Sequence, residues 1–215
     1  MFDLDTIDAA IDLKRKGYKP LLLNMADDDH PGGMVERGSA AQEENLFRRS
    51  NYYKTLTLDM YPLKETDIIY SPQVYYFKSN EASNYELYGK NGHNGIKIDT
   101  IAVPAIRYPA MVQENTTQDT ILKFKNENEK TLMREKIEMI FKCGCIYNHD
   151  ALILSAHGCG AWGGPTHEIA ILFKEMAQKY DKCFRHIVFA ILDNKLLEGW
   201  ASTGNYSVFK TTLTY

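Results

Sequence analysis

Two adjacent carboxylates, Glu43 and Glu44, follow a pair of glycines in the stretch PGGMVERGSAAQEENL, residues 31–46. Carboxylates can perform acid–base chemistry, and the backbone of a glycine turn suits the close approach of a phosphate. Neighbouring residues on a helix point about 100° apart, so the two acids are expected to have different roles. A second interpretation stays open from this loop alone, because acids at a helix N-terminus are also favoured by the helix dipole.

A second glycine turn, GCGAWG at 158–163, lies between a predicted strand and a predicted helix, and it fits the GxGxxG pattern of dinucleotide sites. Such a site expects an acid about 20 residues further on, at the end of the next strand. Here that acid is Asp193, 30 residues beyond Gly163 and near the end of the chain, which disfavours a nicotinamide enzyme. A tight turn without a ligand remains possible. The glycines nevertheless allow a diphosphate to approach, and the helix after Pro165 would point its N-terminus at it.

The cysteines and histidines show no metal-ligand spacing. The four cysteines contain no CxxC pair, and the histidines show neither HxxxH nor HxH spacing, so we expect no metal site. Cys159 lies in the second glycine turn, but no base partner is evident, which favours a small loop residue over a nucleophile. The cysteines are Cys143, Cys145, Cys159 and Cys183, and the histidines are His30, His93, His149, His157, His167 and His186.

The composition indicates one globular domain over residues 1–215, with 44% hydrophobic and 25% charged residues. The net charge is −3 and no block of lysine or arginine appears, so nucleic-acid binding is not expected. Phosphates would therefore be bound mainly by backbone N–H groups and helix ends. No apolar run approaches the roughly 20 residues of a membrane span, and the N-terminus does not resemble a signal peptide. We expect an intracellular protein, cytoplasmic or nuclear, with reduced thiols and no membrane partner.

The hydrophobic pattern predicts alternating strands and helices. A strand at 150–157, a helix at 166–180 and a strand at 185–193 indicate a parallel βαβ unit. We therefore predict an α/β fold with a central mixed sheet and helices on both faces, in which the loops 24–44 and 157–166 lie at strand carboxyl ends, where ligands bind. The other predicted helices are 4–17, 42–56 and 117–143, the last opened by Thr116 and Thr117 and closed by Gly144; the other predicted strands are 19–25, a pair over 67–78 interrupted at Pro72, and 98–106, with a hairpin or loop at 79–97.

The two glycine loops together resemble one known family. PGGMVERGSAAQEE resembles the poly(ADP-ribose) glycohydrolase signature, in which GGG is followed by roughly six to eight residues and QEE. LILSAHGCGAWGGPTHEIAILFKEM resembles the diphosphate-binding loop of the bacterial-type members, and DIIYSPQVYYF, TIAVPAI and HIVFAILD resemble their strands in the same order. The likeness spans about residues 18–193. The chain departs from the signature at Met34, which replaces the third glycine.

The resemblance implies a three-layer α/β/α macrodomain-like fold and a glycosidase that acts at C1″ of ADP-ribose without cofactor or metal. Glu44 would donate a proton to the leaving oxygen and then activate water, while Glu43 would orient the substrate through ribose hydroxyls. A proton donor at neutral pH needs a raised pKa, which burial and a neighbouring carboxylate favour. Asn24 would fix the distal ribose. The remaining residues expected to bind substrate are Gly32, Gly33, Met34, Gln42, Gly158, Cys159, Gly160, Ala161 and Trp162.

The expected partners are ADP-ribose and ADP-ribosylated proteins or poly(ADP-ribose). Three other functions remain open at this stage: a hydrolase specific for mono-ADP-ribosylated protein, a non-catalytic ADP-ribose-binding module, and an esterase for peptide or acetyl-lysine groups. A binding module needs no carboxylate pair, so the Gln42-Glu43-Glu44 triplet favours an enzyme. By the resemblance, the Met34 side chain would narrow the approach to the terminal ribose or shift the loop, which predicts a preference for single or terminal ADP-ribose over cutting within a polymer.

Overall fold

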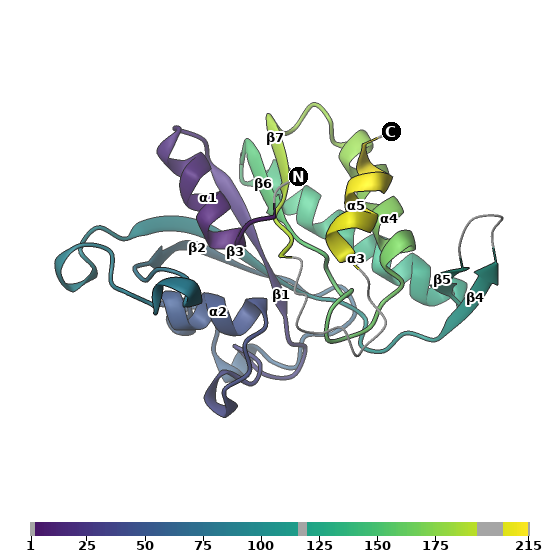
Figure 1. Cartoon of the computed structure of the whole chain (residues 1–215), viewed down its shortest axis with the longest axis horizontal. Helices are drawn as coiled ribbons and strands as arrows, with labels where there is room; N and C mark the ends of the chain where they lie inside the picture. The colour runs from purple at the N-terminus through teal and green to yellow at the C-terminus, as the bar shows by residue number, and fades with distance from the viewer. Residues whose placement is uncertain (1–2, 116–119, 193–203, 215) are drawn as a thin grey trace.

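The computed structural model describes residues 3–115, 120–192 and 204–214. Its main sheet has the strand order β2-β3-β1-β6-β7, in which β2 is antiparallel to β3 and the other neighbours are parallel. The helices α1 and α2 lie on one side of this sheet and α3, α4 and α5 on the other (Figure 1). The strands are β1 (Pro20–Ala26), β2 (Ile69–Tyr76), β3 (Ile96–Pro104), β6 (Ala151–Leu154) and β7 (His186–Phe189), and the helices are α1 (Thr6–Arg15), α2 (Gln42–Arg49), α3 (Glu127–Ile146), α4 (Thr166–Lys179) and α5 (Asn205–Leu213).

The central strand β1 contributes side chains to the two hydrophobic cores that lie on opposite faces of the sheet. Leu21 and Leu23 point into the core shared with α3, α4 and α5, whereas Leu22 between them points into the core under α1 and α2. Alternate side chains of a strand face opposite sides of the sheet, so a strand covered on both faces is apolar throughout. The run PLLLNMA therefore forms a central strand, and the predicted three-layer α/β/α fold with a mixed sheet is confirmed.

The βαβ unit in the C-terminal third is confirmed, and it places one of the two glycine loops. β6 and β7 pair in parallel and α4 connects them, while β1 pairs in parallel with β6 on its other side. The segments 27–41 and 155–165 follow the carboxyl ends of these two adjacent strands. The two loops thus meet at one edge of the sheet, where ligands of such folds bind.

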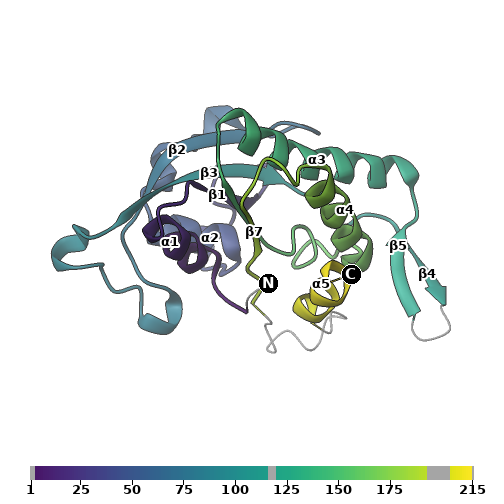
Figure 2. The ribbon, with the colours of Figure 1, turned by 90° about the horizontal axis from the view of Figure 1, so that it is seen from above.

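The predicted helix 117–143 is wrong in its first part. A separate hairpin of β4 (Met111–Asn115) and β5 (Thr120–Phe124) precedes α3, and it projects from the body beside α3 and α4 (Figure 2). The predicted opening at Thr116 and Thr117 lies outside the described residues. The helix also does not end at Gly144, because this glycine lies inside α3, where a Cβ would come within 2.8 Å of the Phe184 ring.

Three other boundaries differ from the prediction. The helix predicted at 42–56 ends at Arg49, and a short 3-10 helix follows at Tyr52–Lys54. The predicted pair over 67–78 is a single strand, β2, whose register shifts between Ser71 and Val74. α5 is an additional helix that packs on α4. The predicted end of the last strand at Asp193 lies outside the described residues, and β7 itself ends at Phe189.

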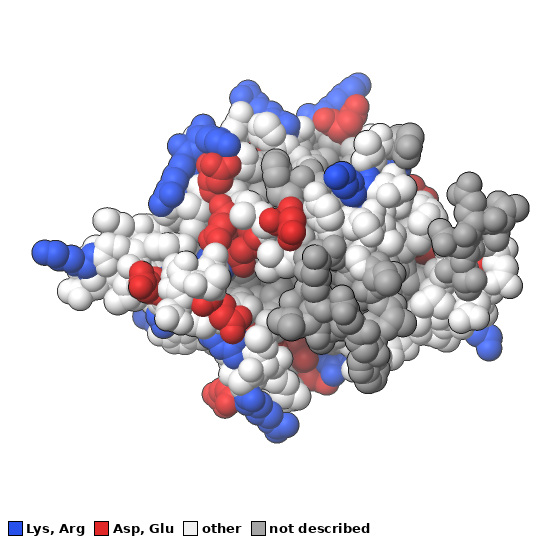
Figure 3. Space-filling view, viewed as in Figure 1, with Lys and Arg blue, Asp and Glu red and all other residues white. Residues whose placement is uncertain are grey.

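Lysine and arginine side chains lie scattered around the rim of the face seen in Figure 3 and form no continuous patch among its coloured residues. None of the helices in the described part of the chain is long and apolar enough to cross a membrane.

Candidate active site

The carboxylate of Glu43 holds the loop that follows β1. Its Oε1 accepts hydrogen bonds from Asn24 Nδ2 at 3.0 Å and from the Gly32 N–H at 3.3 Å, and its Oε2 accepts one from the Asp27 N–H at 2.7 Å. The side chain is 4% exposed, and this burial raises the pKa of Glu43 to about 8 despite the three donors. Glu43 is therefore a buried acid whose hydrogen bonds hold the glycine loop in place.

Glu44 faces the same loop but leaves one oxygen without a partner. Its Oε1 accepts a hydrogen bond from the Met34 N–H at 3.1 Å, while its buried Oε2 has no hydrogen-bond partner in the described structure. Gly33 makes this approach possible, since a Cβ on Gly33 would lie 2.7 Å from Glu44 Oε1. A buried acceptor without a partner is costly, so Oε2 suits a ligand group that donates a hydrogen bond.

Asn24 and Gln42 join α2 to the end of β1. Gln42 accepts from the Met25 N–H at 2.9 Å and donates to the Leu23 carbonyl at 2.7 Å, so it acts as a tether between the two elements. Asn24 is fully buried, and its Oδ1 is a second acceptor without a partner in the described structure. Asn24 Oδ1 and Glu44 Oε2 are thus two buried oxygens without a partner in the described structure, and both suit hydrogen-bond donors of a ligand.

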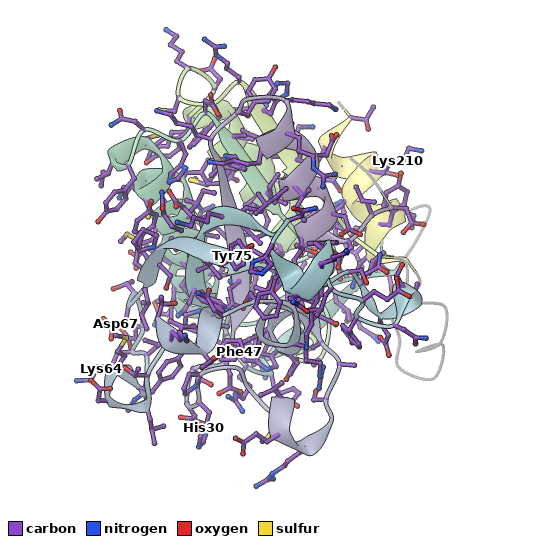
Figure 4. The ribbon with its side chains drawn as sticks, turned by 90° about the vertical axis from the view of Figure 1, so that its left-hand side faces the viewer. His30, Phe47, Lys64, Asp67, Tyr75 and Lys210 are labelled. Atoms are coloured by element: carbon purple, nitrogen blue, oxygen red, sulfur yellow. The ribbon has the colours of Figure 1, made fainter. Side chains whose placement is uncertain are left out.

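The first glycine of the loop, Gly32, lies against α2. A Cβ on Gly32 would come within 2.6 Å of the Phe47 ring, and its φ of +78° is in the left-handed region. Figure 4 shows Phe47 on α2 above His30 of this loop, with Lys64 and Asp67 at the same end of the molecule. Residues near Lys64 are joined to the glycine loop, because the Leu63 N–H donates to the Asp28 carbonyl at 2.8 Å.

The second loop contains two kinds of glycine. A Cβ on Gly158 would lie 2.9 Å from the Ala105 side chain, and one on Gly164 would lie 2.9 Å from the Gly158 carbonyl, so these two glycines are required by packing. A Cβ on Gly160 or Gly163 would meet nothing within 4 Å. The loop is therefore open to a ligand at Gly160 and Gly163, next to Ala161 and Trp162.

Cys159 and His157 are buried and are not placed to act as a nucleophile and its base. The Cys159 thiol contacts the His157 carbonyl oxygen at 3.6 Å, and burial raises the pKa of this thiol to about 12. Burial likewise lowers the pKa of His157 to about 3, so its ring stays neutral. A thiol that remains protonated is a poor nucleophile, in agreement with the prediction of a loop residue.

The sequence interpretation missed Arg107, which follows β3 and contacts both loops. Its guanidinium donates to Asp27 Oδ2 at 3.2 Å and also pairs with Asp28, and it lies over the Trp162 ring at 5.0 Å from the centroid. The sequence did contain one signal for Arg107, because this cationic residue directly follows the strand predicted at 98–106, at its carboxyl end.

One group in the described part of the chain has the spacing of metal ligands: atoms of Asp27, Asp29 and His30 lie within 4.8 Å of one another. Arg107 already pairs with Asp27 and lies 3.8 Å from Asp29 Oδ2, so a cation occupies this neighbourhood. The absence of a metal cofactor stays a prediction.

Comparisons with known proteins point to one family. The family model of the microbial-type poly(ADP-ribose) glycohydrolase catalytic domain matches residues 1–79, which include β1, the glycine loop and α2. Poly(ADP-ribose) glycohydrolase from Deinococcus radiodurans, in a crystal structure with ADP-ribose, superposes with a TM-score of 0.78 at 26% identity, covering 98% of this chain and 82% of that one. Residues 1–79 of this chain thus match the poly(ADP-ribose) glycohydrolase family, and the fold of nearly the whole chain resembles that of its bacterial members.

A second neighbour supports the same fold. Poly(ADP-ribose) glycohydrolase from Thermomonospora curvata, bound to the inhibitor ADP-HPD, gives a TM-score of 0.77 at 24% identity, covering 98% of this chain and 77% of that one. No curated protein sequence matches the chain. The resemblance and the macrodomain-like fold predicted from the sequence are thus confirmed, whereas the roles of the individual site residues remain predictions.

Proposed function

We propose that the protein hydrolyses the glycosidic bond at C1″ of ADP-ribose and releases ADP-ribose from poly- or mono-ADP-ribosylated protein. The match of residues 1–79 to the glycohydrolase family model and the likeness of the fold to bacterial glycohydrolases support a glycosidase. The observation that carries the proposal for this chain is the carboxylate pair: Glu43 accepts three hydrogen bonds that hold the loop, while Glu44 keeps one buried oxygen unpaired. Acid–base hydrolysis of a glycosidic bond needs a positioned carboxyl group that can reach the substrate, and Glu44 beside the fixed loop meets this need.

In this mechanism Glu44 acts first as an acid and then as a base. Protonated Glu44 gives its proton to the oxygen that leaves C1″, and the C1″–O bond breaks through an oxocarbenium-like state. The resulting Glu44 carboxylate takes a proton from water as the water oxygen bonds to C1″, so the products are ADP-ribose and a free hydroxyl or side chain. The Met34 N–H, 3.1 Å from Oε1, orients the carboxyl group throughout.

The remaining residues bind and orient the substrate. Asn24 Oδ1 accepts a hydrogen bond from the distal ribose, and Glu43 accepts ribose hydroxyls with the lone pairs that its three donors leave free. The diphosphate lies along Gly160 and Ala161 at the open side of the second loop, and Trp162 packs against sugar carbon. Gly158 and Cys159 maintain the shape of that loop, and Gln42 maintains the position of α2 relative to β1.

Hydrolysis of mono-ADP-ribosylated protein is the second candidate. Met34 favours it, because its backbone N–H contacts Glu44, its side chain is 45% exposed, and the family signature has a glycine at this position. Both activities use the same acid, and they differ only in the group that is attached to C1″ through the scissile bond.

The test combines two substrates with two variants. The wild type is incubated with labelled poly- and mono-ADP-ribosylated protein, and the products are separated by chromatography. Glu44→Gln should lower turnover by roughly 10²–10⁴-fold, the usual cost of losing acid–base help, while the Kd for ADP-ribose changes by only a few-fold. Glu36→Gln is the matched control, since Glu36 is an exposed acid of the same loop. Full activity of Glu44→Gln would refute the mechanism, and a wild type that binds ADP-ribose but turns over neither substrate would indicate a binding module.

A further inference from the structure

Arg107 stands between the two loops that form the candidate site. It lies in the segment after β3, and β3 is the neighbour of β1 in the sheet. Its Nη2 donates to Asp27 Oδ2 at 3.2 Å, pairs with Asp28, and lies 3.8 Å from Asp29 Oδ2. Three consecutive carboxylates of the first loop therefore surround one guanidinium group.

The same guanidinium group reaches the second loop. Its central carbon lies 5.0 Å from the centroid of the Trp162 ring, within the range of a cation–π contact. The next residue adds a backbone link, since the Tyr108 N–H donates to the Trp162 carbonyl at 3.1 Å. Arginine suits this position because its planar group can stack on a ring while its N–H groups pair with carboxylates.

The first loop transmits this contact to the carboxylate pair. The Asp27 N–H donates to Glu43 Oε2 at 2.7 Å, so the residue held by Arg107 is also held by Glu43. A chain of direct contacts therefore runs from Trp162 through Arg107 and Asp27 to Glu43. It joins the part of the site assigned to the diphosphate to the part assigned to the distal ribose.

We infer that Arg107 is a positioning residue that fixes the spacing of the two loops for a ligand that spans both. The inference rests on the proposed function, because it takes the distal ribose to lie at the first loop and the diphosphate at the second. A ligand that contacts both loops binds more tightly when their spacing is fixed, because the loops lose less conformational entropy on binding. A ligand that contacts only the second loop gains nothing from it.

The two ligands that separate these cases are ADP-ribose and ADP. They share the adenosine and the diphosphate, and only ADP-ribose carries the distal ribose. Arg107→Gln should weaken ADP-ribose binding roughly tenfold and change ADP binding less than about twofold, the first being the size expected from losing an ion-pair network and a cation–π contact. Arg107→Lys keeps the charge but loses the planar stack, so it should recover only part of the difference.

The experiment is calorimetric titration of both ligands into wild type, Arg107→Gln, Arg107→Lys and a control. Arg15→Gln is the matched control, because it makes the same charge change at an exposed position of α1 before β1, away from the carboxyl ends of the strands. Its ratio of the two affinities should equal that of the wild type. Circular dichroism on each variant confirms that the fold is retained, and Arg107→Lys provides a second measurement if Arg107→Gln does not fold.

Three results would overturn the inference. Equal weakening of both ligands in Arg107→Gln would show that Arg107 acts on the diphosphate itself, and unchanged affinities would show that the spacing does not depend on it. A wild type that binds ADP-ribose no more tightly than ADP would overturn the proposed function together with this inference, and it is recognised before any variant is made.

Discussion

Gly33 gives the sharpest test of how the glycine loop positions Glu44, the proposed catalytic acid. Its φ is +56°, and a Cβ would lie 2.7 Å from Glu44 Oε1 and 3.4 Å from Glu43 Oε2. In Gly33→Ala the backbone strain of an L residue in the left-handed region costs about 1–2 kcal/mol. The clash also displaces the Glu44 carboxylate, and a shift of about 1 Å at a reacting group costs on the order of 10²-fold in rate.

The matched control is Gly38→Ala in the same loop. Gly38 has a φ of +85°, but a Cβ there would meet nothing within 4 Å, so this variant carries the backbone strain without the clash. Both variants should lose about 1–2 kcal/mol of stability in urea unfolding. Only Gly33→Ala should lose activity, measured as kcat/KM on an ADP-ribosylated protein. If the two variants lose activity equally, or if Gly33→Ala keeps the wild-type rate, the space beside Glu44 is not what requires the glycine.

Three further outcomes are expected. Gly160→Val should abolish ADP-ribose binding in calorimetry without lowering the unfolding temperature, because a Cβ at Gly160 would meet nothing within 4 Å; retained binding would place the diphosphate elsewhere. Burial raises the pKa of Glu43 from 4.5 to about 8, so the folded state holds this proton more tightly than the unfolded state. The protonated Glu43 therefore stabilises the fold fully below the pKa of the unfolded state, and this stabilisation falls as the pH rises to about 8, by at most about 1.4 kcal/mol per pH unit. Urea unfolding at several pH values should show this fall for the wild type but not for Glu43→Gln. Parallel pH profiles of the two proteins would contradict the assignment. Met34→Gly should increase cutting of long polymer while ADP-ribose affinity stays within about twofold, and equal cutting by both proteins would show that Met34 is neutral.

The sequence predicted the parts of the site that depend on local pattern. Adjacent residues on a helix diverge, and Glu43 and Glu44 indeed have separate partners, Asn24 with two N–H groups for the first and the Met34 N–H for the second. The apolar run of β1 indicated a strand covered on both faces, and the order of strand, turn, helix and strand after residue 150 indicated the βαβ unit.

The features that the sequence did not reveal depend on contacts between distant segments. The five residues of β4 are all exposed, so no apolar alternation marked this strand, and its partner β5 is held through Phe124 N–H by the buried Glu168 of α4 at 2.6 Å. Gly144 looked like a helix end, yet α3 continues past it to Ile146, and the position requires glycine because the Phe184 ring lies where a Cβ would be. The contacts of Arg107 with Asp27 and Trp162 join segments that are far apart in the sequence, so no local pattern marked this residue.

Met34 shows how a departure from a family signature can keep the backbone contact to Glu44. Its φ of −103° lies outside the left-handed region, so the backbone at this position does not require glycine. What the position contributes to Glu44 is its N–H group, and every residue except proline supplies one. Gly33 differs, because there the missing Cβ is itself the requirement. The chain therefore has glycine at position 33, where the Glu44 carboxylate needs space, and methionine at position 34, where the side chain is partly exposed to solvent.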